Sequence, residues 1–146
     1  MYNQLKLDNQ LCFRLYTAAR LVTQAYYHYF KPLEITYSQY LVLLVLWEKD
    51  FMPVNDIAKR LILETNTITP LLQRMERQGL ICRNIGKTDS RQRIVCLTDK
   101  GKKLEEKAKL IPDCLSSKLC QNGLQTQELT QMIPLLDKMI DGLQKA

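Results

Sequence analysis

Cys12 is the side chain with the clearest potential for chemistry, because it falls in the first turn of an expected helix. Asp8 or Asn9 is a suitable N-cap. Apolar residues then recur at steps of three and four up to about Phe30, ahead of Pro32, and form one stripe: Cys12, Leu15, Ala19, Val22 and Tyr26. The dipole at the start of a helix favours a thiolate, the form that reacts with peroxides.

Tyrosines accompany this cysteine, since all seven lie within the first 40 residues. Tyr16 is four residues after Cys12, Tyr26 shares its stripe, and Tyr37 opens the next expected helix. Phenolic hydroxyls can donate hydrogen bonds to a thiolate and stabilise it. The alternative is an inert cysteine in an apolar core, and physical chemistry alone favours that alternative.

A second feature is a concentrated positive charge. The chain carries a net charge of +6 over 146 residues. Residues 73–103 contain nine basic and three acidic residues, so they hold the entire excess, while the other residues are neutral in sum. Such localisation is typical of a surface that binds a polyanion, although a solvated basic face is an equal alternative on charge alone.

Length and composition exclude several classes of protein. The length fits one domain, and the longest apolar run, Tyr40–Trp47, is too short to span a membrane. No secretory signal is evident, so we expect a cytoplasmic protein without a membrane partner. Five cysteines without metal-ligand spacing argue against a disulfide-stapled fold and against a metal site, and the single histidine, His28, is expected at the surface.

The hydrophobic pattern predicts the remaining elements. Tyr37–Glu48 is apolar all round and indicates a buried helix. Short amphipathic patterns on either side of the turn at residues 64–67 indicate two further helices, the second ended by Gly79. Two runs rich in β-branched residues then flank a charged tip at residues 86–92, which predicts a hairpin. Thr98 caps a helix to about Leu110, Pro112 is a break or bend, and residues 125–144 form a last helix.

These elements predict a mainly α fold with a small β-hairpin wing, which is a winged helix-turn-helix. Within the single domain of residues 1–146, residues 37–100 form the DNA-binding portion. Residues 8–30 and 101–146 form helices for dimerisation, because their apolar faces exceed what a small domain needs. The alternative is that these end helices pack on their own domain, but a homodimer also fits DNA with twofold symmetry.

The expected contacts to double-stranded DNA come from the helix after the turn and from the wing. Hydroxyl, amide and guanidinium groups there can reach base edges and phosphates. Arg91 is expected to enter a narrow minor groove, with Asp89 holding its side chain by an ion pair. The full set is Asn66, Thr67, Thr69, Gln73, Arg74, Arg77, Lys87, Asp89, Arg91 and Arg93.

Several segments resemble the MarR family of transcriptional regulators, in particular its organic-hydroperoxide-sensing repressors. They are LDNQLCF (residues 7–13), TYSQYLVLLVLWE (36–48), TITPLLQR (67–74), Asp89-Ser90-Arg91 and LTDKG (97–101). The resemblance implies a homodimeric repressor with Cys12 as the peroxidatic cysteine. It also implies that Tyr26 and Tyr37 hydrogen-bond that thiol, with Tyr16 close by.

Some members of this family use a resolving cysteine from the other subunit. Cys120 lies where that residue is expected, Cys114 competes for the role, and a small-molecule thiol is a third option. Cys82 and Cys96 depart from the family pattern and are placed to face each other across the hairpin. We interpret them first as packing residues, with a cross-strand disulfide as the less favoured reading.

The sequence therefore predicts a repressor that organic hydroperoxide, acting as inducer, releases from a pseudo-palindromic operator by oxidising Cys12. No enzyme activity and no cofactor are expected. One alternative is a regulator released by a small aromatic ligand, with Cys12 inert. Another is a thiol peroxidase, which lacks a supporting His or Arg beside the cysteine and leaves the basic hairpin unexplained.

Overall fold

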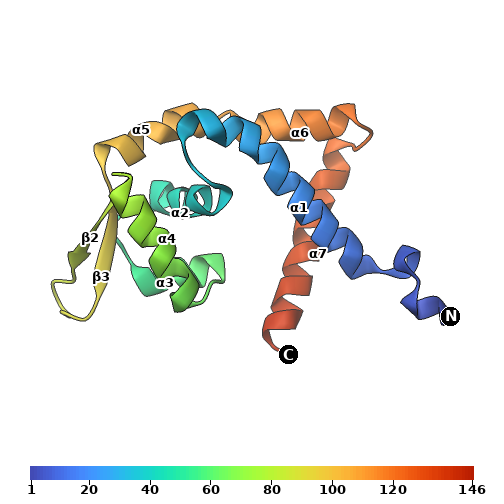
Figure 1. The fold of residues 1–146 in the computed structure, drawn as a ribbon, viewed down its shortest axis with the longest axis horizontal. Helices are drawn as coiled ribbons and strands as arrows, with labels where there is room; N and C mark the ends of the chain where they lie inside the picture. Colours follow the sequence, from blue (N-terminus) through green and yellow to red (C-terminus); the bar gives the residue numbers. More distant parts are fainter. The chain divides into compact units, whose positions relative to one another are not determined.

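The computed structural model describes all residues from Met1 to Ala146, and they divide into two compact units, Met1–Lys109 and Leu110–Ala146. The first unit is mainly helical with a small sheet (Figure 1). Its principal elements are α1 (Leu11–Phe30), α2 (Tyr37–Glu48), β1 (Met52–Pro53), α3 (Val54–Leu61), α4 (Thr65–Arg77), β2 (Ile81–Ile85), β3 (Arg93–Leu97) and α5 (Asp99–Ala108). This architecture confirms the expected winged helix-turn-helix.

Helix α2 forms the centre of this unit. Thr36 caps its start, with the Thr36 hydroxyl accepting from the backbone N–H of Gln39 and the Gln39 side chain accepting from that of Thr36. Val42, Leu43 and Leu46 are fully buried, as expected for a segment that is apolar all round. Helix α2 therefore serves as the core against which α1, α3, α4 and α5 pack.

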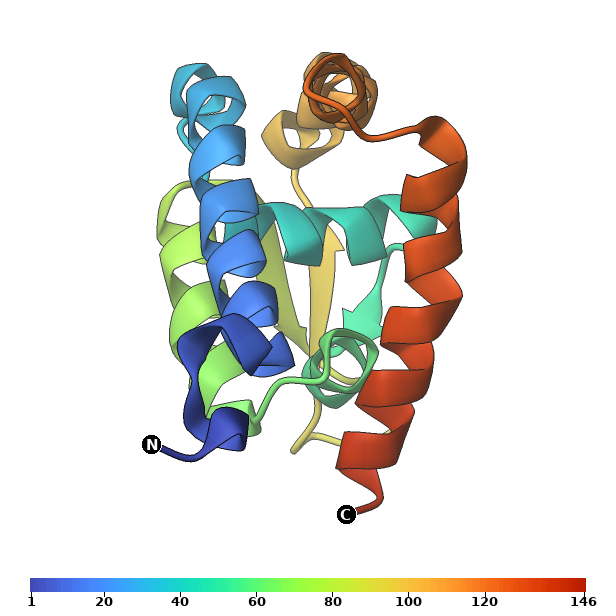
Figure 2. The same ribbon diagram turned by 90° about the vertical axis from the view of Figure 1, so that its right-hand side faces the viewer.

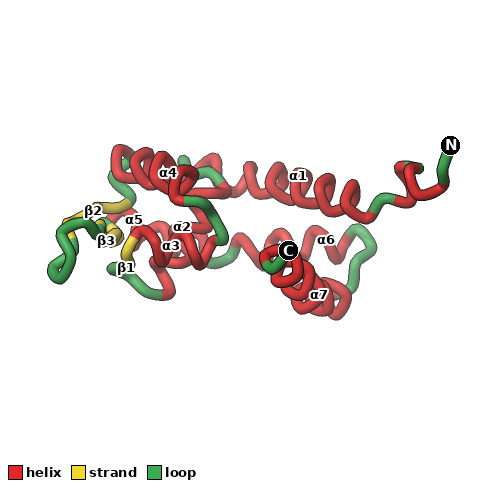
Figure 3. The backbone as a smooth tube through the Cα atoms, turned by 90° about the horizontal axis from the view of Figure 1, so that it is seen from below, coloured by secondary structure: helices red, strands yellow, loops and turns green.

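Helices α3 and α4 form the helix-turn-helix, and an antiparallel sheet in the order β1-β3-β2 follows it. The inner face of α4 buries Ile68, Leu72 and Met75. Strands β2 and β3 form the wing, whose connecting loop extends beyond the helices (Figure 3). The charged tip therefore projects from a base that the core holds in place.

Close packing joins the end of α4 to the start of α5. Gly79 ends α4 with a left-handed φ of 76°, as its position predicts. The Thr98 hydroxyl accepts from the backbone N–H of Gly101, which confirms Thr98 as the cap of α5. A Cβ atom at Gly101 would lie 2.3 Å from the carbonyl oxygen of Leu80, so only glycine fits there.

Helix α1 contacts the rest of the first unit near its C-terminal end, where the buried Phe30 packs on Tyr40 of α2. Figure 2 shows the axis of α2 lying across that of α1. Its N-terminal half extends away and exposes Leu11, Phe13 and Tyr16. The expected cap at Asp8 or Asn9 is wrong, because both residues lie in a 3-10 turn and Gln10 occupies the N-cap without a side-chain hydrogen bond.

The second unit contains α6 (Ile111–Gln121) and α7 (Thr126–Gln144). The sequence predicts a break or bend at Pro112 and does not predict α6. The structure places Pro112 in the first turn of α6. Backbone N–H groups there have no partner within the helix, so the missing N–H of proline costs nothing, and its fixed φ suits a helix. No helix of either unit is both long enough and apolar enough to cross a membrane.

Candidate functional site

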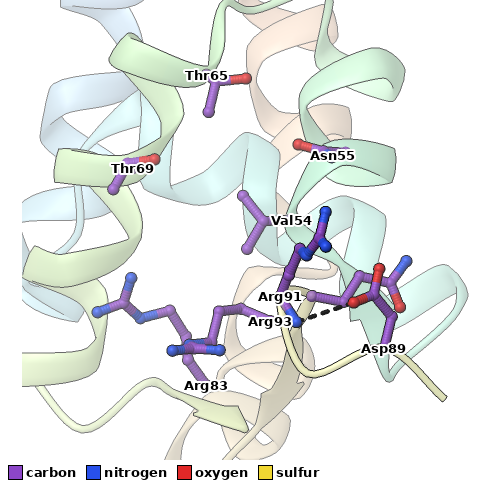
Figure 4. Close-up of a pocket in the computed structure, with 9 residues that line it drawn as sticks. Val54, Asn55, Thr65, Thr69, Arg83, Asp89, Arg91 and Arg93 are labelled. Carbon is purple, nitrogen blue, oxygen red and sulfur yellow. Dashed lines mark hydrogen bonds between the residues drawn. The ribbon is translucent and has the colours of Figure 1, made fainter. Parts of the chain in front are cut away.

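A hollow of about 390 Å³ lies between the helix-turn-helix and the wing (Figure 4). Helix α4 contributes Thr65 and Thr69, and the start of α3 contributes Val54 and Asn55. The wing contributes the remaining lining residues, Arg83, Asp89, Arg91, Gln92 and Arg93. Hydroxyl groups therefore face guanidinium groups across a space open to solvent.

Three arginines and one carboxylate set the charge of this hollow. Asp89 does not hold the Arg91 side chain by an ion pair, so that expectation is wrong. Its Oδ1 instead accepts a hydrogen bond from the backbone N–H of Arg91 at 3.0 Å, while Arg93 donates to the carbonyl oxygen of Ser90 at 3.2 Å. Asp89 thus fixes the turn of the loop and leaves the Arg91 guanidinium without a carboxylate partner.

Arg83 connects the wing to α4, and the sequence reasoning missed it. Its guanidinium forms an ion pair with Glu76 at 3.2 Å, and its backbone N–H donates to the other Glu76 oxygen, also at 3.2 Å. The side-chain hydrogen bond from Arg83 is the main cause that lowers the pKa of Glu76. The Nε atom of Arg83 is buried and has no partner. Only the surplus of basic residues in this segment could have pointed to it.

The other residues expected to contact DNA are exposed but do not line the hollow. Lys87 lies at the wing tip, and the rest lie on the outer face of α4: Asn66, Thr67, Gln73, Arg74 and Arg77. Of the expected set, the hollow brings together Thr69, Asp89, Arg91 and Arg93. The sequence reasoning also missed Thr65 and Asn55, which are short polar residues without a distinguishing pattern.

An aromatic cluster fills the corner between α1 and α2. Tyr26 stacks on Phe30 with ring centroids 5.1 Å apart and lies 5.1 Å from Tyr37, and Tyr40 lies 4.7 Å from Phe30. Burial, and then Tyr37, raises the pKa of Tyr26, and burial raises that of Tyr40 to about 12. Tyr26 and Tyr40 therefore remain protonated hydrogen-bond donors at neutral pH.

Cys12 lies in the first turn of α1, as expected, and is exposed rather than part of a core. Tyr16 lies one turn further along the same helix and is 71% exposed. Tyr26 is about four turns from Cys12, which is roughly 21 Å along the helix axis. The tyrosine cluster of a chain therefore cannot reach the Cys12 thiol of the same chain.

Hydrogen bonds connect the start of α2, beside the aromatic cluster, to the end of α4. Gln39, two residues after Tyr37 at the start of α2, is 4% exposed, and its amide donates to the Gln78 side chain at 2.7 Å. The Gln78 amide donates in turn to the carbonyl oxygen of Glu34 at 3.2 Å. Gln78 is the C-cap of α4, so Glu34, before α2, and Gln39, at its start, are both hydrogen-bonded to the end of α4.

The remaining cysteines are also free thiols. Cys114 is exposed on α6, and Cys120 is half-buried with its sulfur 3.7 Å from the Thr126 hydroxyl. Cys82 and Cys96 are directly paired across β2 and β3, which confirms that they face each other across the hairpin.

Comparisons with known proteins agree with this geometry. A family model described as transcriptional regulator SarA/Rot matches residues 25–108. The organic hydroperoxide resistance transcriptional regulator of Bacillus subtilis is 39% identical, with 97% of this chain and 95% of that protein covered. Two solved AbfR structures, from a protein of Staphylococcus epidermidis, are also similar.

The first, reduced AbfR bound to DNA, has a TM-score of 0.79 at 39% identity and covers 96% of both chains. The second, described as disulfide-formed AbfR, has a TM-score of 0.66 at 38% identity and covers 94% of both chains. Fold, charge and sequence agree, and the chain belongs to the MarR family of winged helix-turn-helix, DNA-binding transcriptional regulators, and not to a family of enzymes.

Proposed function

We propose that this protein is a homodimeric repressor that senses organic hydroperoxides by oxidation of Cys12 and then releases its operator. The observation that carries the proposal is the exposed thiol in the first turn of α1, in a chain 39% identical to an organic hydroperoxide resistance regulator. AbfR adds support, since it has been solved both reduced on DNA and with a disulfide formed.

Helix α4 and the wing would read the DNA. The exposed polar face of α4 is suited to a major groove, and Arg91, free of any carboxylate partner, is suited to the adjacent minor groove. We call residues 37–108, from α2 to α5, the DNA-reading head. Two copies of this head, related by a twofold axis, would bind a pseudo-palindromic operator with half-sites about one helical turn apart.

The sensing site requires two chains. A thiolate in a peroxide sensor needs hydrogen-bond donors, and the phenolic hydroxyls of Tyr26 and Tyr37 are the donors that the sequence offers. They are too far from Cys12 of their own chain, so a dimer would place the partner subunit's Tyr26 and Tyr37 beside it. Residues 8–30 and 101–146 would supply the dimer contacts, and apolar residues such as Leu11, Phe13 and Ile133 are exposed and free for that purpose.

Oxidation would proceed in two balanced steps. The Cys12 thiolate attacks the hydroperoxide, takes one oxygen atom to become a sulfenic acid, and releases an alcohol once the alkoxide is protonated. A second thiol then attacks the sulfenic sulfur, forming a disulfide and releasing water. Cys120 of the partner subunit is the first choice for this thiol, with Cys114 or a small-molecule thiol as alternatives.

The link between Gln39 and Gln78 offers a route from this site to the DNA. Oxidation of Cys12 would remove the acceptor of the tyrosine hydroxyls and shift the start of α2. Because Gln39 at the start of α2 is hydrogen-bonded to the C-cap of α4, that shift would move the helix that reads the DNA. The two heads would lose the spacing that the operator requires, and repression would end.

A gel-shift experiment tests the proposal. A DNA duplex selected by the reduced protein from a random pool is titrated with reduced protein and with protein treated with one equivalent of cumene hydroperoxide. We expect oxidation to weaken binding by about 100-fold, a change of about 2.7 kcal/mol. We expect Cys12→Ser to bind as the reduced protein does and to ignore the oxidant.

Cys114→Ser is the comparison variant, since it removes the exposed thiol named as an alternative reactant. Unchanged release leaves Cys120 or a small-molecule thiol as the second thiol, and lost release assigns that role to Cys114. A Cys12→Ser protein that still releases DNA with one equivalent of oxidant would refute the sensor assignment. Release by an aromatic compound while all thiols stay reduced would instead favour a ligand-gated regulator.

A further inference from the structure

The base of the wing contains a pair of thiols that the proposed sensing reaction does not use. Cys82 on β2 and Cys96 on β3 are direct partners in the antiparallel ladder. Pairs at the same alternation, Leu80 with Thr98 and Gly86 with Gln92, are joined by backbone hydrogen bonds, so the cysteines occupy a hydrogen-bonded pair of positions. Such pairs have Cα atoms about 5.5 Å apart, within the range that a disulfide spans.

The two thiols differ in their surroundings. Cys82 is exposed to solvent, whereas Cys96 is only 8% exposed. The Cys96 sulfur lies 3.8 Å from the carbonyl oxygen of Cys82 and accepts from the Asn84 side-chain amide at 3.8 Å. Burial, and then the adjacent Cys82 thiol, raises the pKa of Cys96. An oxidant therefore reaches Cys82 first, and the protonated thiol of Cys96 lies beside it.

We propose that Cys82 and Cys96 form a second oxidation site, at which excess hydroperoxide closes a reversible disulfide across the wing and weakens DNA binding. The hydroperoxide transfers one oxygen atom to the Cys82 sulfur and leaves as an alcohol. The Cys96 sulfur then attacks this sulfenic acid, an S–S bond forms, and the displaced hydroxyl leaves as water with the proton of the Cys96 thiol. The two thiols together lose two electrons to the hydroperoxide.

The position of the pair connects it to the DNA-reading surface. Every basic wing residue that faces the hollow or the tip lies in the loop that the disulfide would close: Arg83, Lys87, Arg91 and Arg93. Arg83 directly follows Cys82, and both its backbone N–H and its guanidinium are bonded to Glu76 of α4. Cβ atoms in a sheet pair are about 4.5–5.5 Å apart and must approach to about 3.8 Å in a disulfide.

Closing the bond therefore pulls β2 toward β3 beside Arg83 and loosens its link to α4. The same strain makes the disulfide easy to reduce, as suits a reversible modification. Since Cys82 is not at a helix start, the site needs more oxidant than Cys12 does, and it acts after the first sensor.

The test uses the triple variant Cys12→Ser/Cys114→Ser/Cys120→Ser, whose only remaining cysteines are the wing pair. It is treated with excess cumene hydroperoxide and examined by thiol titration, intact mass and gel shift. We expect loss of both free thiols, a mass lower by two hydrogen atoms in the monomer, and DNA binding weakened by about three- to tenfold, restored by dithiothreitol. Adding Cys82→Ser or, separately, Cys96→Ala to this background should abolish the affinity change.

Thiols that stay free, or that oxidise only to sulfinic acids or to disulfides between chains, would overturn the inference. A wing disulfide that leaves DNA affinity unchanged would overturn its connection to DNA binding. Because the triple variant lacks Cys12, these outcomes do not depend on the first sensor. The Cys12 test can likewise be repeated in a Cys82→Ser/Cys96→Ala background.

Discussion

The DNA-reading head and the region around Cys12 differ in how much of their structure one chain supplies. In the head, the contacts that stabilise the fold join residues of the same chain. Examples are the buried faces of α2 and α4, the Thr98 cap and the Glu76–Arg83 ion pair. Around Cys12, the helix is exposed, and Tyr26 lies roughly 21 Å along the same helix, with Tyr37 of α2 next to Tyr26. A single chain supplies the whole DNA-reading head, whereas the proposed sensing site needs a second chain.

This difference separates what substitutions in each region should change. Damage to the core of the head should appear as lost stability, and damage to its exposed cations as lost DNA affinity. Damage to the thiol region should leave both intact and alter only the response to oxidant. The contact between Gln39 and Gln78 is where the two kinds of effect should meet, because it belongs to the head and borders the tyrosine cluster.

The largest effect is expected at Gly101, where the core of the head has no space. Gly101→Ala would place a Cβ atom 2.3 Å from the Leu80 carbonyl oxygen and force α5 away from the end of α4. We expect a loss of at least about 3 kcal/mol in the free energy of unfolding, measured by urea denaturation. Gly142→Ala is the matched control, because nothing lies within 4 Å of its Cβ position, and it should be neutral or slightly stabilising.

Arg91→Ala should produce the largest loss of DNA affinity without loss of stability. Its guanidinium has no carboxylate partner and lies in the wing loop beside the hollow. We expect binding to weaken by about 10- to 100-fold and the slope of log affinity against log salt to fall by about 1. Lys109→Ala, which removes one positive charge at the end of α5, should change neither quantity appreciably. Equal effects of the two variants would show that the head is recognised only through its net charge.

Tyr37→Phe should affect the response to oxidant and leave DNA binding alone. Removing one hydrogen bond to a charged group costs about 1.5 kcal/mol, which corresponds to about a tenfold slower reaction of Cys12 with hydroperoxide. Stopped-flow measurement of thiol loss tests this, with Tyr27→Phe, an exposed tyrosine, as the control. A normal oxidation rate in Tyr37→Phe would remove Tyr37 from the proposed thiol pocket.

The sequence predicted the head well because its features are local. Each signal depends only on residues close to it in the sequence. These signals are the apolar patterns of α2 and α4, the glycine after α4 and the threonine before α5. Helix α6 was missed because Pro112 is compatible with either ending one helix or starting another. What decides between these is the packing of Ile111 and Leu115, which local sequence does not specify.

The candidate site was predicted only in part, because its links are not local. A spacing of two residues placed Asp89 near Arg91 but could not tell whether the carboxylate bonds to the side chain or to the backbone N–H. The Glu76–Arg83 pair joins a helix to a strand, and no pattern in the sequence predicts it. The stripe of Cys12 identified an apolar face of α1, but a stripe does not say whether the same chain or another covers it.

The smallest expected effect concerns that Glu76–Arg83 link, and it tests whether the head acts as one body. Arg83→Lys keeps the positive charge but cannot reproduce the planar contact with the carboxylate. We expect DNA affinity to fall by only about two- to fivefold, with the salt slope unchanged because no charge is lost. This combination would differ from the result for Arg91→Ala and would mean that Arg83 holds the wing against α4. A salt slope reduced by about 1 would instead mean that Arg83 itself neutralises a phosphate, and the link to Glu76 would then be incidental to DNA binding.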